Sequence, residues 1–112
     1  MLTFALLVFA VGAIGGLVLA SHVLRGKFAP WALSLIHALL GAVGLILLIV
    51  VLVHGAATHQ VTISFILFLI AALGGFVLAS FHLRKRLPPK AAVIGHAGLA
   101  IVGFLVLLAA VI

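Results

Sequence analysis

The chain contains four long apolar stretches separated by short polar connectors. Each stretch has about the 20 residues that a helix needs to cross a hydrocarbon core of about 30 Å. Short connectors hold consecutive helices antiparallel and side by side. The pattern therefore predicts an all-α fold, a four-helix transmembrane bundle forming one integral membrane domain over residues 1–112. The predicted spans are Leu2–Leu24, Trp31–Val53, Val61–Leu83 and Ala91–Ile112.

Composition supports the membrane prediction and excludes several kinds of chemistry. The chain is 69% hydrophobic and contains no Asp or Glu, so it cannot give a soluble domain a polar surface. Without acidic residues, we expect neither catalysis by paired carboxylates nor drug export of the kind that uses an acidic side chain within the membrane. Without cysteine, disulfides, iron–sulfur clusters and covalently attached haem are excluded. We expect no catalytic residue, and an electron carrier or a subunit rather than a stand-alone enzyme.

All six Lys and Arg residues lie in the first and third connectors. These connectors are Arg25–Pro30 and Arg84–Lys90, whereas the middle connector, His54–Gln60, carries none. A topological role explains this distribution more simply than binding to nucleic acid. The positive-inside rule predicts cytoplasmic basic connectors and both termini outside, and we expect a bacterial inner membrane.

The two halves of the sequence resemble each other. Residues 1–53 align with residues 60–112 without a gap, and 19 positions are identical. We expect a tandem duplication of one two-helix hairpin, with a pseudo-twofold axis along the membrane normal. Shared apolar composition does not explain the matches of Arg25 with Arg84, Pro30 with Pro89 and His37 with His96.

Two of the aligned residues are histidines inside predicted helices. Each of His37 and His96 lies about six residues into its helix, about 9 Å below the basic boundary. A polar ring at this depth is costly, so both rings should face the bundle interior and have a partner. Small residues follow one and two turns farther along the same face of each helix. They are Gly41 and Gly44 after His37, and Ala100 and Gly103 after His96.

Paired histidines on the second and fourth helices of a membrane bundle, with glycines along the same face, resemble the haem-bearing bundle of the b-type cytochromes. The resemblance implies one non-covalent haem b with His37 and His96 as axial ligands. The small residues Gly41, Gly44, Ala100 and Gly103 would flank the macrocycle. Arg25 and Arg84 would meet its propionates, and the protein would exchange single electrons with quinol or a partner subunit. Members often carry a second histidine on each ligand helix, but no histidine follows His96, so we expect one haem.

A structural interpretation competes with the haem prediction. The small residues would then let helices pack closely, and the two histidines would bond to each other, a carbonyl or water. The chain would be a non-redox scaffold or anchor of a larger membrane complex, or a homo-oligomer. Chlorophyll is a third possibility, since one intramembrane histidine can ligate it.

The remaining polar residues have simpler interpretations. His22 and His82 end the first and third helices, one position out of register in the repeat, and we expect them to contact lipid phosphate or a propionate. A second ligand pair and a quinone contact are the alternatives. Ser21 and Ser80 should bond back to carbonyls of their own helices. Close helix approach or room for a porphyrin edge explains Gly15-Gly16 and Gly74-Gly75, and His54 and His59 are ordinary connector polarity.

Overall fold

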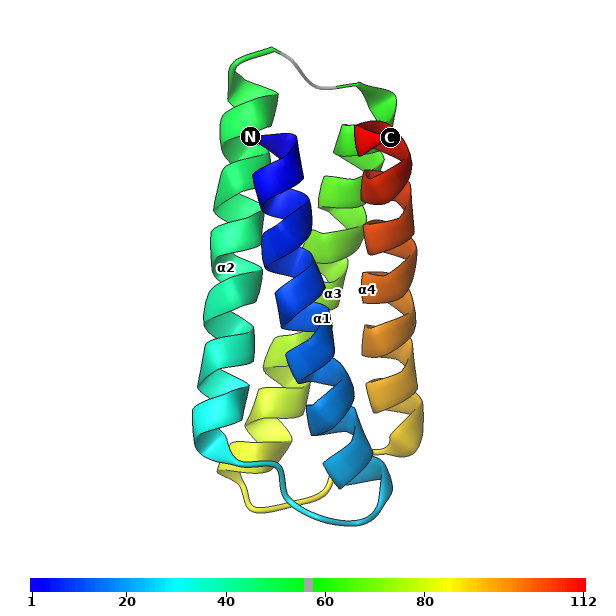
Figure 1. The fold of residues 1–112 in the computed structure, drawn as a ribbon. Helices are drawn as coiled ribbons and strands as arrows, with labels where there is room; N and C mark the ends of the chain where they lie inside the picture. The colour runs from blue at the N-terminus through cyan, green and yellow to red at the C-terminus, as the bar shows by residue number, and fades with distance from the viewer. Residues whose placement is uncertain (56–57) are drawn as a thin grey trace.

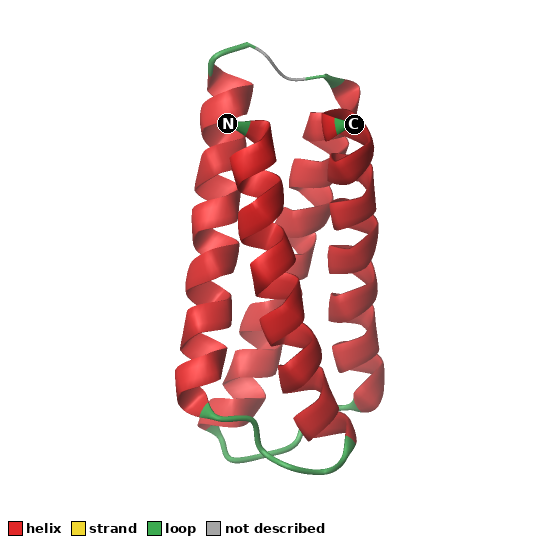
Figure 2. Ribbon diagram, in the orientation of Figure 1, coloured by secondary structure: helices red, strands yellow, loops and turns green. Residues whose placement is uncertain are grey.

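The computed structural model describes residues 1–55 and 58–112, which form four α-helices and, within those ranges, no strand. The helices are α1 (Leu2–Leu24), α2 (Trp31–Val53), α3 (His59–Leu83) and α4 (Lys90–Val111). They run alternately up and down (Figure 1, Figure 2), so both chain termini lie at one end of the bundle. We call this the terminal end, and the opposite end, with residues 25–30 and 84–89, the basic end.

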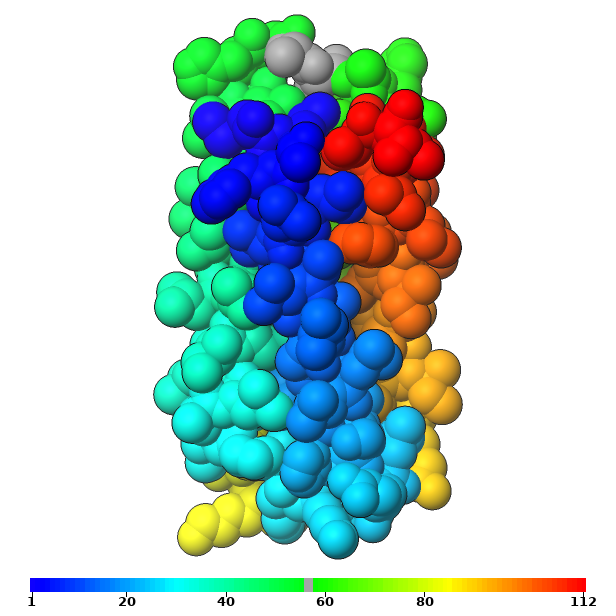
Figure 3. Space-filling model, viewed as in Figure 1, coloured from blue at the N-terminus to red at the C-terminus, as the bar shows by residue number. Residues whose placement is uncertain are grey.

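The four helices form a closed ring. The most extensive interfaces lie within the hairpins α1–α2 and α3–α4, and α1–α4 and α2–α3 complete the ring. In the space-filling view, α1 is flanked by α2 and α4 (Figure 3). One diagonal of the bundle therefore joins α1 to α3, and the other joins α2 to α4. Because the helices on each diagonal run parallel, side chains at equal depth can meet on the bundle axis.

The dimensions and the outer surface fit a lipid bilayer. The molecule is 43 Å long, enough to cross a hydrocarbon core of about 30 Å. All four helices are long and apolar enough to span a membrane. Large apolar side chains point outward on every helix, among them Leu7, Leu39, Leu73 and Ile101. The predicted all-helical bundle of four membrane-length helices is therefore confirmed.

Helix boundaries follow the prediction with small differences. The bounds of α1 and α2 are as predicted. The third helix begins at His59 rather than Val61. The Thr58 hydroxyl caps this helix by accepting a 3.4 Å hydrogen bond from the Val61 N–H, so the polar residues His59 and Gln60 form its first turn. The fourth helix begins at Lys90 rather than Ala91, directly after Pro89.

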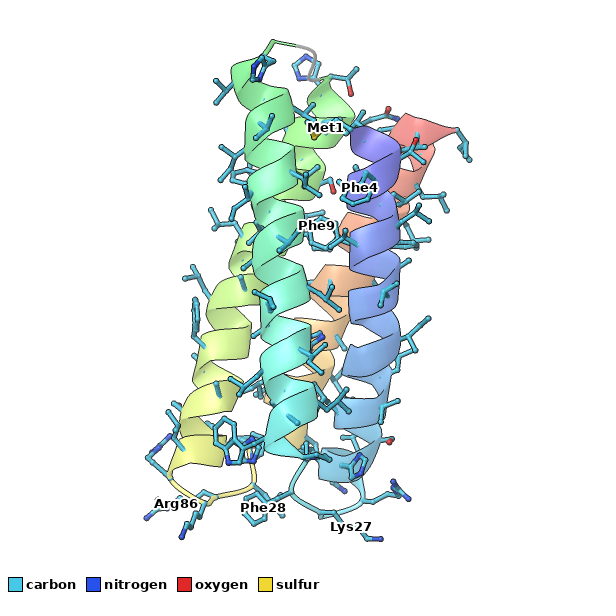
Figure 4. The ribbon with its side chains drawn as sticks, turned by 60° about the vertical axis from the view of Figure 1, so that its left-hand side comes forward. Met1, Phe4, Phe9, Lys27, Phe28 and Arg86 are labelled. Carbon is cyan, nitrogen blue, oxygen red and sulfur yellow. The ribbon has the colours of Figure 1, made fainter. Side chains whose placement is uncertain are left out.

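The tightest packing lies toward the terminal end. Phe9 of α1 and Phe68 of α3 stack across the diagonal, with ring centroids 3.8 Å apart and ring planes at 2°. Figure 4 shows Phe9 pointing into the bundle. Leu48 and Leu107 are completely buried in the same cluster. We call this cluster the terminal core; its buried members are Ala5, Phe9, Leu48, Val51, Val61, Phe68 and Leu107.

Candidate functional site

His37 and His96 face each other across the diagonal between α2 and α4. Their ring centroids are 6.2 Å apart and their ring planes are at 80°. Both residues are half-buried, in the half of the bundle nearer the basic end. The structure thus brings together the two histidines that the sequence pairs.

Each imidazole is tethered to the neighbouring helix of its own hairpin. Nδ1 of His37 lies 2.9 Å from the carbonyl oxygen of Gly12, and Nδ1 of His96 lies 2.7 Å from that of Ala71. Because a carbonyl only accepts, Nδ1 is the donor in each bond, and this assigns the tautomer. In this tautomer the other ring nitrogen, Nε2, carries the lone pair. A donor bond at Nδ1 is the usual support of a histidine that binds a metal through Nε2.

The centroids of the two rings are about as far apart as those of two imidazoles that share one metal ion. A metal–nitrogen bond of about 2.0 Å and a ring radius of about 1.1 Å put an imidazole centroid about 3.1–3.2 Å from the metal. Two imidazoles on opposite sides would have centroids about 6.3 Å apart, close to the observed 6.2 Å. Each ring can turn about its own metal–nitrogen bond, so an angle of 80° is compatible with shared ligation.

Within residues 1–55 and 58–112, no three His, Cys, Asp or Glu side chains gather in a metal-binding group.

Two glycines make room for the imidazoles. A Cβ on Gly16 would lie 2.8 Å from Cε1 of His37, and a Cβ on Gly75 would lie 3.2 Å from Cε1 of His96. Gly16 and Gly75 belong to the glycine pairs that the sequence associates with close helix approach or a porphyrin edge. Their contact with the histidines was not predicted, although each glycine precedes its histidine by the same spacing.

The small residues beyond each histidine have different surroundings. Phenyl rings cover the two deeper glycines: a Cβ on Gly44 would lie 2.5 Å from Phe9, and one on Gly103 would lie 3.5 Å from Phe68. Over residues 1–55 and 58–112, nothing lies within 4 Å of a Cβ built on Gly41. Ala100 is half-buried. The position next to Gly41 is therefore open, while at Gly44 the terminal core begins.

The predicted propionate partners lie at the basic end and bond to their own helices. Nε of Arg25 donates to the Ser21 carbonyl (2.9 Å), and Nε of Arg84 donates to the Ser80 carbonyl (3.2 Å). The chain has no acidic side chain with which either guanidinium could pair. The serine prediction is confirmed, because the hydroxyls of Ser21 and Ser80 donate to the carbonyls of Val18 and Val77.

His22 and His82 make unrelated contacts. Nδ1 of His22 donates to the Val18 carbonyl (2.8 Å) within α1. His82 instead stacks on the Trp31 ring, with centroids 3.8 Å apart and planes at 6°. The two residues are thus not equivalent partners, and the aromatic partner of His82 was not predicted.

The histidines at the terminal end are exposed. Nδ1 of His54 donates to the Val50 carbonyl (2.8 Å), and His59 is the first residue of α3. Both observations agree with the prediction that these histidines are polar residues of an exposed connector. Residues 56 and 57 of this predicted connector lie outside the described residues.

No protein family, curated protein or solved structure matches this chain.

Proposed function

We propose that this protein binds one haem b between His37 and His96 and carries single electrons in the membrane. The observation that carries the proposal is a pair of half-buried imidazoles, each tethered through Nδ1, with centroids 6.2 Å apart. Two imidazoles that share one metal ion would have centroids at a similar separation, and a donor bond at Nδ1 is the usual support of a metal-binding histidine. When bound, haem would supply a centre that accepts and releases one electron.

The chain's own residues would hold the ligand in three ways. The carbonyls of Gly12 and Ala71 fix the orientation of the imidazoles and make their Nε2 atoms better ligands. Gly16 and Gly75 let the rings lie against α1 and α3. Gly41 and Ala100 would flank the ligand with small side chains, whereas Phe9 and Phe68 cover Gly44 and Gly103.

Charge supports the same ligand. Haem carries two propionates, and this chain has six cationic side chains and no acidic one. All six are at the basic end, the end nearer to the histidine pair. Arg25 and Arg84 are our candidates for the propionate contacts. They would exchange their present single backbone bonds for bidentate contacts to carboxylates.

We further infer that the chain arose by tandem duplication of a hairpin and has a pseudo-twofold axis along the membrane normal. The 19 identities between residues 1–53 and 60–112 support this origin. Contacts of aligned residues support it too. Both histidines bond to the aligned carbonyls of Gly12 and Ala71, and both contact the aligned glycines Gly16 and Gly75.

The proposal includes an orientation and a partner. With the basic end in the cytoplasm of a bacterium, both termini would face outward across the inner membrane. The histidine pair would then lie in the cytoplasmic half of the bilayer. Electrons would be exchanged there with quinol or with a partner subunit of a larger complex.

An absorption spectrum tests the haem proposal. We expect the full chain, purified in mild detergent after expression with haem available, to be red and to show sharp low-spin bands after reduction with dithionite. His37→Ala and His96→Ala should each abolish these bands. His54→Ala is the matched control, because His54 bonds within its own helix at the terminal end, and it should keep them. A colourless wild-type protein, or colour that survives both alanine variants, would refute the proposal.

A non-redox scaffold is the second candidate. One observation favours it: each imidazole already has a carbonyl partner at Nδ1, the interhelical hydrogen bond that a purely structural histidine would make. Co-purification with other membrane proteins but without pigment would support this function. Extraction of the pigment, if one is present, distinguishes haem from chlorophyll by its spectrum.

A further inference from the structure

A pocket at the basic end is separate from the proposed haem site and shares no lining residue with the His37–His96 pair. Its volume is about 410 Å³. Phe28 and other side chains of the basic end are visible in Figure 4, on the same end as Lys27 and Arg86. The lining residues come from both basic connectors and the adjoining helix ends: Phe28, Ala29, Pro30, Trp31, His82 and Lys85.

The walls of this pocket are aromatic. The rings of Trp31 and His82 stack with centroids 3.8 Å apart, and the Phe28 ring lies 6.1 Å from His82 at 15°. Trp31 is the only tryptophan of the chain. Tryptophan is enriched at the level of lipid headgroups, because its ring is apolar and its N–H is polar. The pocket thus lies where a membrane-spanning chain meets the headgroup layer.

The pocket is not a by-product of the repeat. The alignment of residues 1–53 with residues 60–112 gives each main lining residue a different partner in the other half. Those partners are Leu87 for Phe28, Lys90 for Trp31, Val23 for His82 and Gly26 for Lys85. The combination of two aromatic rings, an imidazole and an ammonium therefore occurs on one side of the bundle.

Lys85, which lines this pocket, has an unfavourable backbone conformation. Its φ is +55°, in the left-handed region, and Gly26 takes that position in the other connector with φ +77°. The two turns are otherwise alike: the N–H of Gly26 donates to the Val23 carbonyl, and that of Lys85 to the His82 carbonyl. A side chain in this region costs about 1 kcal/mol or more, which glycine avoids. Such a conformation persists only where the surrounding structure holds it, which makes Lys85 a candidate functional residue.

We propose that this pocket binds the phosphate headgroup of one anionic phospholipid. Lys85 supplies the cation, and the chain contains no acidic side chain to neutralise it. Phe28 and Trp31 supply apolar walls for the glycerol and the start of the acyl chains. Phospholipid, rather than free phosphate, is the ligand because the site combines charge with aromatic walls at the end of a membrane-spanning bundle. This inference does not depend on haem.

Native mass spectrometry of the full chain in mild detergent tests the site. The protein is mixed with equal amounts of phosphatidylglycerol and phosphatidylcholine that carry identical acyl chains, and the ratio of the two bound lipids is measured. We expect wild type to retain phosphatidylglycerol preferentially, as a single bound molecule. Lys85→Gly should lower that preference about fivefold, the effect of one ammonium near an anionic headgroup. Glycine accepts the left-handed backbone, so this variant keeps the turn.

Lys27→Gln is the matched control. It removes one charge from the other basic connector, and Lys27 does not line the pocket. We expect its lipid preference to equal that of wild type. An equal loss in both variants would mean diffuse attraction to the basic end and would overturn the proposal. The absence of a preference in wild type, or release of the lipid by millimolar inorganic phosphate, would overturn it as well.

Discussion

The terminal half and the basic half of this bundle share the same four helices but fill the bundle axis differently. In the terminal half, two phenyl rings stack on the axis, and Leu48 and Leu107 are completely buried beside them. In the basic half, the axis is occupied by two half-buried imidazoles, each bonded to a backbone carbonyl. The buried hydrophobic residues near the basic end are the small or medium ones Ala29 and Val93.

This difference places the aromatic packing and the proposed ligand site in separate halves of the bundle. In lipid, helix association depends on packing and interhelical hydrogen bonds, because apolar side chains gain little by leaving lipid for protein. The terminal core therefore supplies the packing that holds the hairpins together. The axis of the basic half is instead occupied by His37 and His96, where we propose that haem binds.

Substitution of Gly44 by alanine should have the largest effect on stability. A Cβ at this position would lie 2.5 Å from the Phe9 ring, so the ring must leave its stack with Phe68. We expect a loss of about 1–3 kcal/mol in the free energy of unfolding, the usual cost of overpacking. Unfolding in mixed detergent micelles, followed by circular dichroism, measures it. The positions of the absorption bands of the proposed haem should not change.

Gly41→Ala is the control for this prediction. Gly41 lies one turn from Gly44, and in the described parts of the chain nothing lies within 4 Å of its Cβ position. Alanine is favoured over glycine in a helix by about 0.5–1 kcal/mol, so this variant should be as stable as wild type or more so. Equal destabilisation by both substitutions would show that the terminal core does not end at Gly44.

Gly16→Ala should have the opposite pattern. The new Cβ would lie 2.8 Å from Cε1 of His37, and the imidazole rather than a helix would have to move. We expect the free energy of unfolding to fall by about 1 kcal/mol. Haem retention should fall about tenfold, as it does when a group that orients a metal ligand is lost. Competition with a haem-binding apoprotein measures the retention. Gly75→Ala, with its contact at 3.2 Å, should have the smaller effect; a Gly16→Ala variant that unfolds easily but keeps its haem would reverse the roles of the two halves.

The membrane-spanning helices could be predicted because lipid leaves the backbone little choice. A chain in hydrocarbon must satisfy its own N–H and C=O groups, so a long apolar run is a helix. The start of α3 was missed because Thr58 caps the helix ahead of two polar residues, His59 and Gln60. The pattern of apolar residues gives no information about such a cap.

The partners inside the bundle could be predicted only in part. His37 and His96 could be predicted to face each other, because they lie at equal depth in aligned helices and a polar ring in lipid must turn inward. The stack of Phe9 on Phe68 was not predicted, because residues that face lipid and residues that face the core are equally apolar. The carbonyl acceptors were not predicted either. They depend on how each hairpin is rotated, which residue types do not reveal.

Ser64→Ala should have the smallest effect and completes the comparison. The Ser64 hydroxyl is completely buried and donates to the Gly103 carbonyl across the α3–α4 interface (2.9 Å). Its aligned residue in the other hairpin is Ala5, which is also completely buried, so alanine fits this environment. Interhelical hydrogen bonds in membranes contribute about 0.6 kcal/mol on average, and we expect a loss of that size in the unfolding measurement used for Gly44→Ala. Thr62→Ala is the control, because the exposed Thr62 hydroxyl donates to the carbonyl of Thr58, the residue that caps the same helix, and it should have no measurable effect. A loss for Ser64→Ala greater than that for Gly44→Ala would mean that a polar contact, not aromatic packing, holds the terminal half together.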